Sequence, residues 1–446
     1  RKESGNAALT AADLRQDEDC LDTWFSSWLW PVSLFDGIND PDNEEMAYYY
    51  PTSDLVTGPD IIFFWVARMI MAGYEYEGDM PYRNVYFTGI VRDKIGRKMS
   101  KSLGNSPDPI ELIDRYGADG VRMGMMLSAP AGNDILFDEA LCEQGRNFCN
   151  KIWNAFRLIK GWQVSDDVDF EALASAELCS CWMREKMEYV TREVNDLFGK
   201  YRISEALMTI YNFFWDDFSS WYLEVIKPDY GQPIDRETYR STIGFMNELL
   251  HLLHPFMPFI TEELWQQLEP RQEGESLMTD VLPWVRKRDD YSLFEPMEEV
   301  RAIVAHIRNL RQQKNISPKE RLTLLALNRN TGDSFNDSIL VKMANLSDIM
   351  DMKAKPDFAV SFMVNTTEYA VPLDDNIDVE AEIARMQAEL KHKEGFLQGV
   401  MKKLGNEKFV ANAPAAVLEL ERKKQADAES IIRSLKEGIA ALQQQQ

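Results

Sequence analysis

The chain has 446 residues, of which 45% are hydrophobic and 11% aromatic, and its formal net charge at pH 7 is −24. This composition excludes a disordered chain, and the length suggests about three domains with buried cores. The large negative charge argues against a protein that binds nucleic acid non-specifically through one broad basic face.

Cysteine usage and hydropathy predict a soluble cytoplasmic protein. The five cysteines are scattered and form no CxxC pair, which is typical of reduced thiols. The longest apolar stretch, residues 61–74, has 14 residues and contains Arg68. It is too short and too charged to cross a membrane. We expect no membrane contact, and we expect a monomer.

Residues 1–105 mix short aromatic segments with loops. Within them, the β-branched run NVYFTGIV at 84–91 predicts a buried strand. A glycine-bearing basic loop follows this strand directly. Strand, loop and then helix is the order in which α/β folds place ligands at the carboxyl ends of their strands.

Residues 106–150 begin with a helix that has clear start and stop signals. Asp108 is the expected N-cap and Pro109 the first helical residue. Gly117 is expected to end this helix, and Asp119 to cap the next one.

Residues 151–295 have helical periodicity. Two apolar stripes repeat every three or four residues and predict an α-helical bundle. The stripes are Ile203, Leu207, Ile210, Phe214, Phe218, Tyr222 and Val225, and then Phe245, Leu249, Leu252, Phe256 and Ile260.

Residues 296–375 predict a small α/β unit, with one helix at 296–314 and three short strands, RLTLLAL, FAVSFMV and YAVPL. Residues 376–446 carry two apolar series with 3–4 spacing, separated by a turn, which predict an antiparallel coiled-coil hairpin. This last segment is neutral, with 11 basic and 11 acidic residues.

The segment 92–105, RDKIGRKMSKSLGN, holds five basic residues and one acidic residue within an acidic protein. Lysines on a flexible glycine-bearing loop can fold over a polyphosphate and neutralise the charge of a departing pyrophosphate. Lys98 and Lys101 would do this, while Ser100 offers a hydroxyl and a backbone N–H. The alternative is a solvated basic loop.

The five residues KMSKS at 98–102 match the second signature of class I aminoacyl-tRNA synthetases, and the chain resembles that family. DTWFSSWLWP at 22–31 and VTGPDIIFFWVARM at 56–69 resemble segments that line the family's amino-acid pocket. FSSWYLEVIKP and HPFMPFITEELW resemble helices of its anticodon-binding bundle. The terminal hairpin is characteristic of the valine members, to which the resemblance is closest.

The resemblance implies a multidomain, mainly α protein. Its expected parts are the C-terminal part of a Rossmann-like α/β catalytic core with the KMSKS loop (1–105), a stem-contact connector (106–150), an anticodon-binding helical bundle (151–295), a small α/β unit (296–375) and a coiled-coil tRNA-binding arm (376–446). The first class I signature, His-Ile-Gly-His, does not occur. We therefore expect the C-terminal half of such an enzyme, without its editing domain and inactive alone.

The resemblance also implies roles in the activation of valine. Lys101 and Lys98 would stabilise the transition state, with Ser100, Gly58 and Asp60 completing the ATP site. Mg²⁺ would arrive with ATP, held by the phosphates. The alternative for Gly58 and Asp60 is an ordinary turn with a helix cap.

Trp24 and Trp65 would form the walls of the amino-acid pocket, because rigid aromatic rings suit a small branched substrate. The alternative is that both are plain core tryptophans. His251 and His254 lie among Leu and Phe, and we expect them to lack nearby cysteine or carboxylate partners. We interpret them as core or boundary histidines and predict no metal site.

The tRNA(Val) contacts implied by the resemblance come from two regions. Arg146, Lys151 and Arg157 resemble the stretch that faces the anticodon stem and loop. The arm would add lysines that meet phosphates; these are Lys402, Lys403 and Lys408. Solvent-exposed helices are the alternative in both regions. Two other functions stay open: a non-catalytic tRNA-binding module, and a synthetase for isoleucine or leucine.

Overall fold

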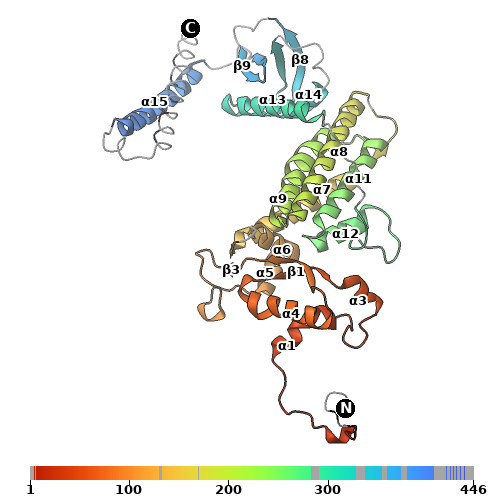
Figure 1. The fold of residues 1–446 in the computed structure, drawn as a ribbon. Coiled ribbons are helices and arrows are strands. Elements are labelled where there is room, and N and C mark those ends of the chain that lie inside the picture. Colours follow the sequence, from red (N-terminus) through yellow and green to blue (C-terminus); the bar gives the residue numbers. More distant parts are fainter. Residues whose placement is uncertain are drawn as a thin grey trace. The chain divides into compact units, whose positions relative to one another are not determined.

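The structure is a computed structural model that describes residues 5, 7–129, 133–168, 170–282, 291–327, 337–353, 359–372 and 379–405, with isolated positions beyond 405. The chain divides into two compact units, Arg1–Val300 and Arg301–Gln446 (Figure 1). Among the described helices, none has both the length and the apolar character needed to cross a bilayer.

The first unit opens with short helices around two parallel strands. The elements are η1 (Ala11–Asp13), α1 (Thr23–Trp28), α2 (Trp30–Ser33), α3 (Glu44–Tyr49), β1 (Thr52–Thr57), η2 (Pro59–Ile61), η3 (Ile62–Val66), α4 (Ala67–Tyr76) and β2 (Tyr82–Phe87). Leu55 of β1 lies opposite Val85 of β2. Leu55 packs with Val66, Met69 and Tyr82 into a small core under this pair. Residues 52–87 thus contain a parallel strand pair with helices around it, whereas the Rossmann-like core expected for 1–105 stays a prediction.

The strand expected at 84–91 is divided in two. β2 ends at Phe87, and a separate short strand, β3 (Val91–Arg92), pairs in parallel with β4 (Ile135–Leu136). Gly89 lies in the break, where a Cβ atom would be only 2.0 Å from the carbonyl oxygen of Asn133. Because another backbone passes so close, only glycine fits at this position.

Two connector helices follow the basic loop and the short helix η4 (Lys101–Leu103): α5 (Pro109–Tyr116) and α6 (Ala118–Leu127). Asp108 caps α5 by accepting the N–H of Ile110 at 2.8 Å, as predicted. The expected cap of α6 by Asp119 is wrong. Gly117 is its N-cap, with φ 76°, whereas the buried carboxylate of Asp119 accepts an N–H from Ile260 at 2.7 Å.

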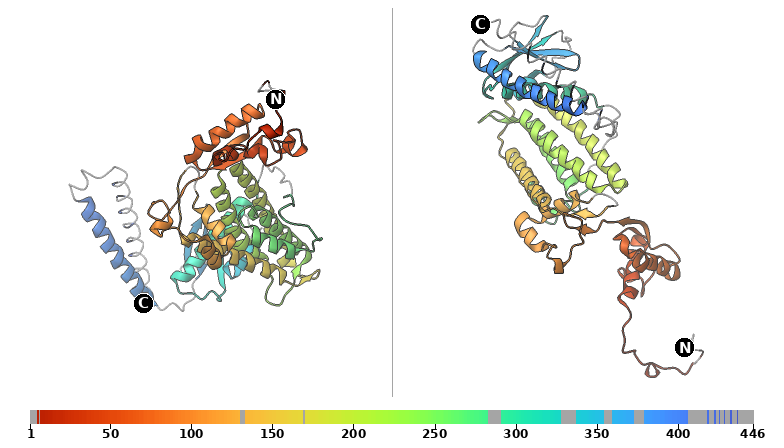
Figure 2. Two further views of the ribbon diagram at one scale, coloured as in Figure 1. Left: turned by 90° about the horizontal axis from the view of Figure 1, so that it is seen from below. Right: turned by 90° about the vertical axis from the view of Figure 1, so that its left-hand side faces the viewer.

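The long helices of the bundle lie side by side (Figure 1 and Figure 2). Its elements are α7 (Glu139–Lys160), β5 (Val164–Ser165), α8 (Phe170–Gly199), α9 (Ile203–Asn212), η5 (Phe213–Tyr222), α10 (Leu223–Ile226), β6 (Ile234–Asp235), α11 (Arg236–Leu253) and α12 (Pro258–Leu268). Most of both predicted stripes is buried, whereas Ile203 and Ile260 are only partly buried. Helix α7 continues across residue 150 without a break.

Helices α6 and α7 touch backbone to backbone. A Cβ atom on Gly145 of α7 would be 2.4 Å from the carbonyl oxygen of Gly120 on α6, and one on Gly124 would be 2.7 Å from the amide nitrogen of Cys142. This contact holds the connector against the helix that carries Arg146.

The second unit contains a four-stranded sheet with the order β8-β7-β10-β9. Its elements are β7 (Leu322–Leu327), α14 (Asp337–Ala344), β8 (Leu346–Met352), β9 (Ala359–Val364) and β10 (Thr367–Pro372), preceded by α13 (Phe294–Gln313), which begins in the first unit. The predicted helix and three strands are present, and β8 was missed.

The last described helix is α15 (Val379–Leu404), which contains the first of the two apolar series. The second series falls almost entirely outside the described residues. Within the described part, the ammonium of Lys436 forms an ion pair with Glu394 of α15 at 2.8 Å. The coiled-coil hairpin stays a prediction.

Candidate nucleotide and tRNA site

The basic loop begins with a tight turn after β3. Arg92 and Lys98 pair as an isolated antiparallel bridge, and the Asp93 N–H donates to the carbonyl of Arg97 at 3.0 Å. Gly96 has φ 81°, a conformation that glycine adopts readily. The side chain of Lys98 is exposed, and its ammonium has no hydrogen-bond or ion-pair partner among the described residues. It is therefore available to an anion.

The second half of the loop is held by local hydrogen bonds. The hydroxyl of Ser100 lies 3.0 Å from that of Ser102 and accepts the N–H of Leu103 at 3.2 Å. Lys101 begins the short helix η4, and its side chain lies outside the described part of the structure. The expected role of Ser100 as a phosphate contact thus competes with a structural role that the loop already gives it.

Gly58 and Asp60 lie at the carboxyl end of β1. Gly58 is the N-cap of η2, and a Cβ atom there would be 2.7 Å from a carboxylate oxygen of Asp60. The Asp60 side chain therefore folds back over the Gly58 α-carbon, while remaining exposed. The same Cβ position is 3.6 Å from Ile90, three residues before the turn of the basic loop. The carboxyl end of β1 thus lies beside the residue that leads into the basic loop.

Trp24 and Trp65 come from adjoining elements, α1 and η3, and both are partly buried. They do not form one aromatic pair. Trp24 stacks on Phe64 with ring centroids 6.3 Å apart, whereas Trp65 stacks on Trp30 at 5.9 Å. The Trp65 indole donates to the carbonyl of Ser27 at 3.0 Å, which ties η3 to α1.

A cavity of about 860 Å³ opens beside β1 and includes Trp30, Leu34, Tyr48 and Tyr49 in its lining. It does not include Trp24 or Trp65, and the amino-acid pocket with these two residues as its walls stays a prediction.

The three predicted tRNA contacts on α7 do not share one face. Arg146 and Arg157 are eleven residues apart, three helical turns, so they project from the same side about 16 Å apart. Lys151 lies about 140° around the helix, with its ammonium 4.9 Å from the centre of the Trp215 ring. Arg157 is exposed, and Arg146 is partly buried and paired with Glu143 at 3.1 Å.

The predicted arm contacts are only partly described. Lys402 and Lys403 are exposed in the last turn of α15, where lysine also interacts favourably with the helix dipole. Lys408 lies outside the described residues.

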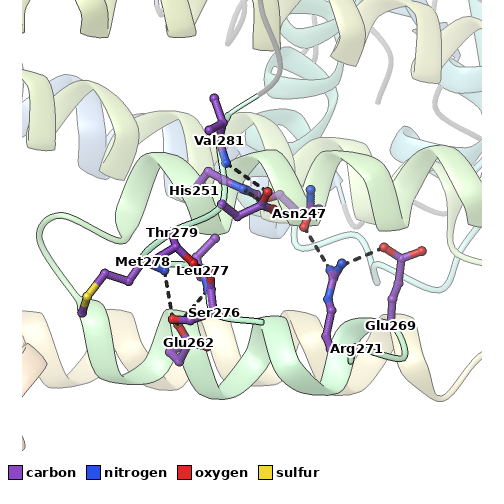
Figure 3. Close-up of polar contacts among 11 residues, drawn as sticks. Asn247, His251, Glu262, Glu269, Arg271, Ser276, Leu277, Met278, Thr279 and Val281 are labelled. Atoms are coloured by element: carbon purple, nitrogen blue, oxygen red, sulfur yellow. Dashed lines mark hydrogen bonds and ion pairs between the residues drawn. The ribbon is translucent and has the colours of Figure 1, made fainter. Parts of the chain in front are cut away.

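The two histidines have protein partners and belong to the bundle, and Figure 3 shows the surroundings of His251. His251 is buried, with Nδ1 2.8 Å from the carbonyl of Asn247 and Nε2 3.1 Å from Asp280. Nδ1 of His254 lies 2.8 Å from the Thr261 hydroxyl. The interpretation as core or boundary histidines is confirmed, but the expectation that they lack a carboxylate partner is wrong, because Asp280 contacts His251. In the part of the chain that the structure describes, no group of three or more His, Cys, Asp or Glu could hold a metal ion.

Sequence reasoning missed two polar residues that shape the basic loop. Asp93 and Asn105 flank it and bond to each other at 3.0 Å. The signal was present in the sequence, because the only acid and the only amide of segment 92–105 stand near its two ends.

Comparisons with known families match three parts of the chain. Residues 2–138 match the model for class I tRNA synthetases (I, L, M and V), and residues 181–326 match the anticodon-binding domain of tRNA ligases. Residues 378–443 match the valyl tRNA synthetase tRNA binding arm.

Several curated relatives are similar over almost the whole chain. The valine–tRNA ligase of Bacteroides thetaiotaomicron is 70% identical over 444 residues, which are 99% of this chain and 50% of that protein. The corresponding ligases of Bacteroides fragilis and Porphyromonas gingivalis are 66% and 59% identical, also over 99% of this chain and 50% of theirs. The chain spans about half the length of the curated relatives it matches. With three family models and these relatives in agreement, the chain belongs to the valyl-tRNA synthetase family of class I tRNA synthetases.

Proposed function

We propose that this chain is the part of a valine–tRNA ligase that supplies the phosphate loop and the tRNA-binding elements. The whole enzyme would use ATP to activate valine to valyl-adenylate and then transfer valine to tRNA(Val). The observation that carries the proposal is the junction at the carboxyl end of the parallel strands, where Gly58 and Asp60 lie beside Ile90 and the chain leads on into the basic loop. Ligands of α/β folds bind at this end of the strands.

The chemistry of the junction fits a nucleoside triphosphate. The exposed ammonium of Lys98 can neutralise charge on the leaving pyrophosphate, and Asp60 can accept a hydrogen bond from a ribose hydroxyl. Lys101 is proposed to act beside Lys98. Mg²⁺ would be held mainly by the phosphates.

The exposed apolar surface of residues 30–80 supports the proposal that catalysis needs more than this chain. Parallel sheets are normally covered on both faces, yet among the described strands β1 pairs only with β2. Phe63 is 81% exposed and Tyr48 is 80% exposed. A further α/β segment, corresponding to the unmatched half of the relatives, would cover this surface.

The test combines this chain with a separately produced polypeptide that corresponds to the unmatched half of the Bacteroides thetaiotaomicron relative. The readout is amino-acid-dependent exchange of labelled pyrophosphate into ATP. We expect exchange with valine only when both polypeptides are present, and a reduction of about a hundredfold with Lys98→Ala or Lys101→Ala.

Lys94→Ala is the matched control for that experiment. Lys94 belongs to the same basic segment, but its ammonium is paired with Asp138 at 2.7 Å, so its removal should leave exchange unchanged. Exchange that depends on isoleucine or leucine would show that the amino acid is wrong. An equal loss with Lys94→Ala would show that only the summed charge of the loop matters.

A non-catalytic tRNA-binding module is the second candidate. The match of residues 181–326 and 378–443 to anticodon-binding and tRNA-binding models favours it. Binding of tRNA(Val) without any exchange in the combined assay would support it over the first proposal.

A further inference from the structure

The basic loop is closed at its base by two side chains. Asp93 is the first residue of the turn. Asn105 directly follows Gly104, shortly after the KMSKS segment ends. The Asn105 amide nitrogen donates to Asp93 at 3.0 Å. This bond joins positions twelve residues apart and makes residues 93–105 a ring.

Asn105 uses its whole amide group for this purpose. Its nitrogen also donates to the carbonyl of Lys98 at 3.3 Å, and its oxygen accepts the N–H of Ser100 at 2.9 Å. One side chain therefore fixes the backbone on both sides of Met99. These contacts hold the α-carbon of Lys98 in place while its ammonium stays exposed.

Asp93 anchors the other side of the ring. Its carboxylate accepts the N–H of Ile95 at 3.1 Å, the N–H of Arg97 at 2.8 Å and the guanidinium of Arg97 at 2.7 Å. With the bond from Asn105, four donors converge on a side chain that is only 12% exposed. A carboxylate that is satisfied in this way resists rotation, because any rotation breaks several charge-assisted bonds together.

We propose that Asp93 and Asn105 are positioning residues that keep the phosphate loop preformed, so that the lysine at position 98 meets a polyphosphate without first ordering the loop. This inference rests on the proposed function for its ligand, but the ring itself does not. A loop that is competent only part of the time binds its ligand more weakly by that fraction.

The ring can be tested without any ligand, because the loop contains its own protease sites. Trypsin cleaves after arginine and lysine, and Arg97, Lys98 and Lys101 all lie inside the ring. We expect Asn105→Ala and Asp93→Asn to be cut within residues 97–101 about tenfold faster than the unchanged chain, since cleavage follows the open fraction. Asn84→Ala is the matched control, because it removes an exposed amide that bonds to Ser53 and Asp54 on β1 instead.

Exchanging the two side chains distinguishes loss of the Asp93–Asn105 hydrogen bond from a general loosening of the loop. Asn105→Asp places two carboxylates against each other and should open the ring. The double variant D93N/N105D restores one donor opposite one acceptor and should be cut more slowly than N105D. The ring would be refuted if the single variants were cut no faster than the unchanged chain. It would also be refuted if D93N/N105D were cut as fast as N105D.

Inorganic tripolyphosphate is the probe for the second step. We expect Asn105→Ala to raise its dissociation constant about tenfold, corresponding to an open fraction near nine-tenths. K98A should weaken binding without faster cutting after Arg97, because it removes the contact and leaves the ring. Loosening of the loop with unchanged tripolyphosphate affinity would refute the positioning role. If the unchanged chain does not bind tripolyphosphate, the proposed function fails for this site, and the cleavage data still decide whether the ring exists.

Discussion

The contact between α6 and α7 allows a sharp test, because the same substitution at two glycines should have opposite effects. In Gly145→Ala the new Cβ would be 2.4 Å from the carbonyl oxygen of Gly120 and within 3.0 Å of two more backbone atoms of that residue. In Gly244→Ala, within α11, the new Cβ would meet nothing within 4 Å.

The expected changes in unfolding free energy follow from the contact geometry and from helix propensity. Ordinary contact begins near 3.4 Å, so α6 and α7 must separate by about 1 Å to admit the methyl group. Overpacking of this kind costs about 1–3 kcal/mol, and rigid backbone atoms place this case at the upper end. Alanine offsets about 1 kcal/mol of it through its better helix propensity. We therefore expect Gly145→Ala to destabilise the first unit by about 2 kcal/mol, and Gly244→Ala to stabilise it by about 1 kcal/mol.

The assay is urea unfolding followed by tryptophan fluorescence. All 11 tryptophans lie within residues 1–300, so the signal reports the first unit alone. Circular dichroism of each folded variant checks that the helices are retained. A Gly145→Ala chain as stable as the unchanged chain, or stabilised like Gly244→Ala, would refute the close backbone contact between α6 and α7.

Three further predictions use single side chains. Tyr222→Phe should lower the unfolding free energy by about 1 kcal/mol in the same urea assay, because the buried Tyr222 hydroxyl bonds to Thr242 at 2.8 Å. Asp119→Ala should lower it by about 1 kcal/mol, since it removes the acceptor of two partly buried N–H groups at the start of α12, although burial of the carboxyl, which raises its pKa, offsets part of the loss. The hydrogen bond from Asn105 is the main reason why the pKa of Asp93 is lowered from 3.8 to about 2. Because the folded value is the lower one, the Asp93 carboxylate stabilises the folded loop above pH 3.8 and loses this effect as the pH falls toward 2; an NMR titration with a midpoint near 4 would contradict this.

The bundle could be predicted from the sequence because its signals are local. Leu207, Ile210, Phe214 and Phe218 repeat at helical spacing, and all four are buried. The cap at Asp108 could also be predicted, because a capping side chain acts on a residue two or three positions away. The five-residue signature was enough to single out the basic loop, whose phosphate-binding role stays a proposal.

Other features depend on contacts that are distant in sequence. Asp119 looked like the cap of its own helix, but it bonds to residues 140 and 141 positions later. The strand expected at 84–91 breaks at Gly89 because residue 133 passes against it. Strand β8 was missed because LSDIMDM contains two acids and only its first residue is buried.

The candidate site was predicted in outline and not in detail. The position of Gly58 beside Ile90, which leads into the basic loop, follows from strand order, which a sequence pattern can suggest. The separate stacking partners of Trp24 and Trp65 depend on how η3 packs on α1. Helical geometry alone could have predicted that Lys151 lies on a different face of α7 from Arg146 and Arg157.

The central claim is that this chain carries the tRNA recognition of a valine–tRNA ligase. The most direct measurement is a fluorescence anisotropy titration of the chain, at one stated salt concentration, with tRNA(Val) and with the same tRNA carrying an altered anticodon. The account predicts a preference of about tenfold or more for the native anticodon, ~1.4 kcal/mol. Equal affinity for both, or tighter binding of an isoleucine tRNA in the same assay, would contradict it.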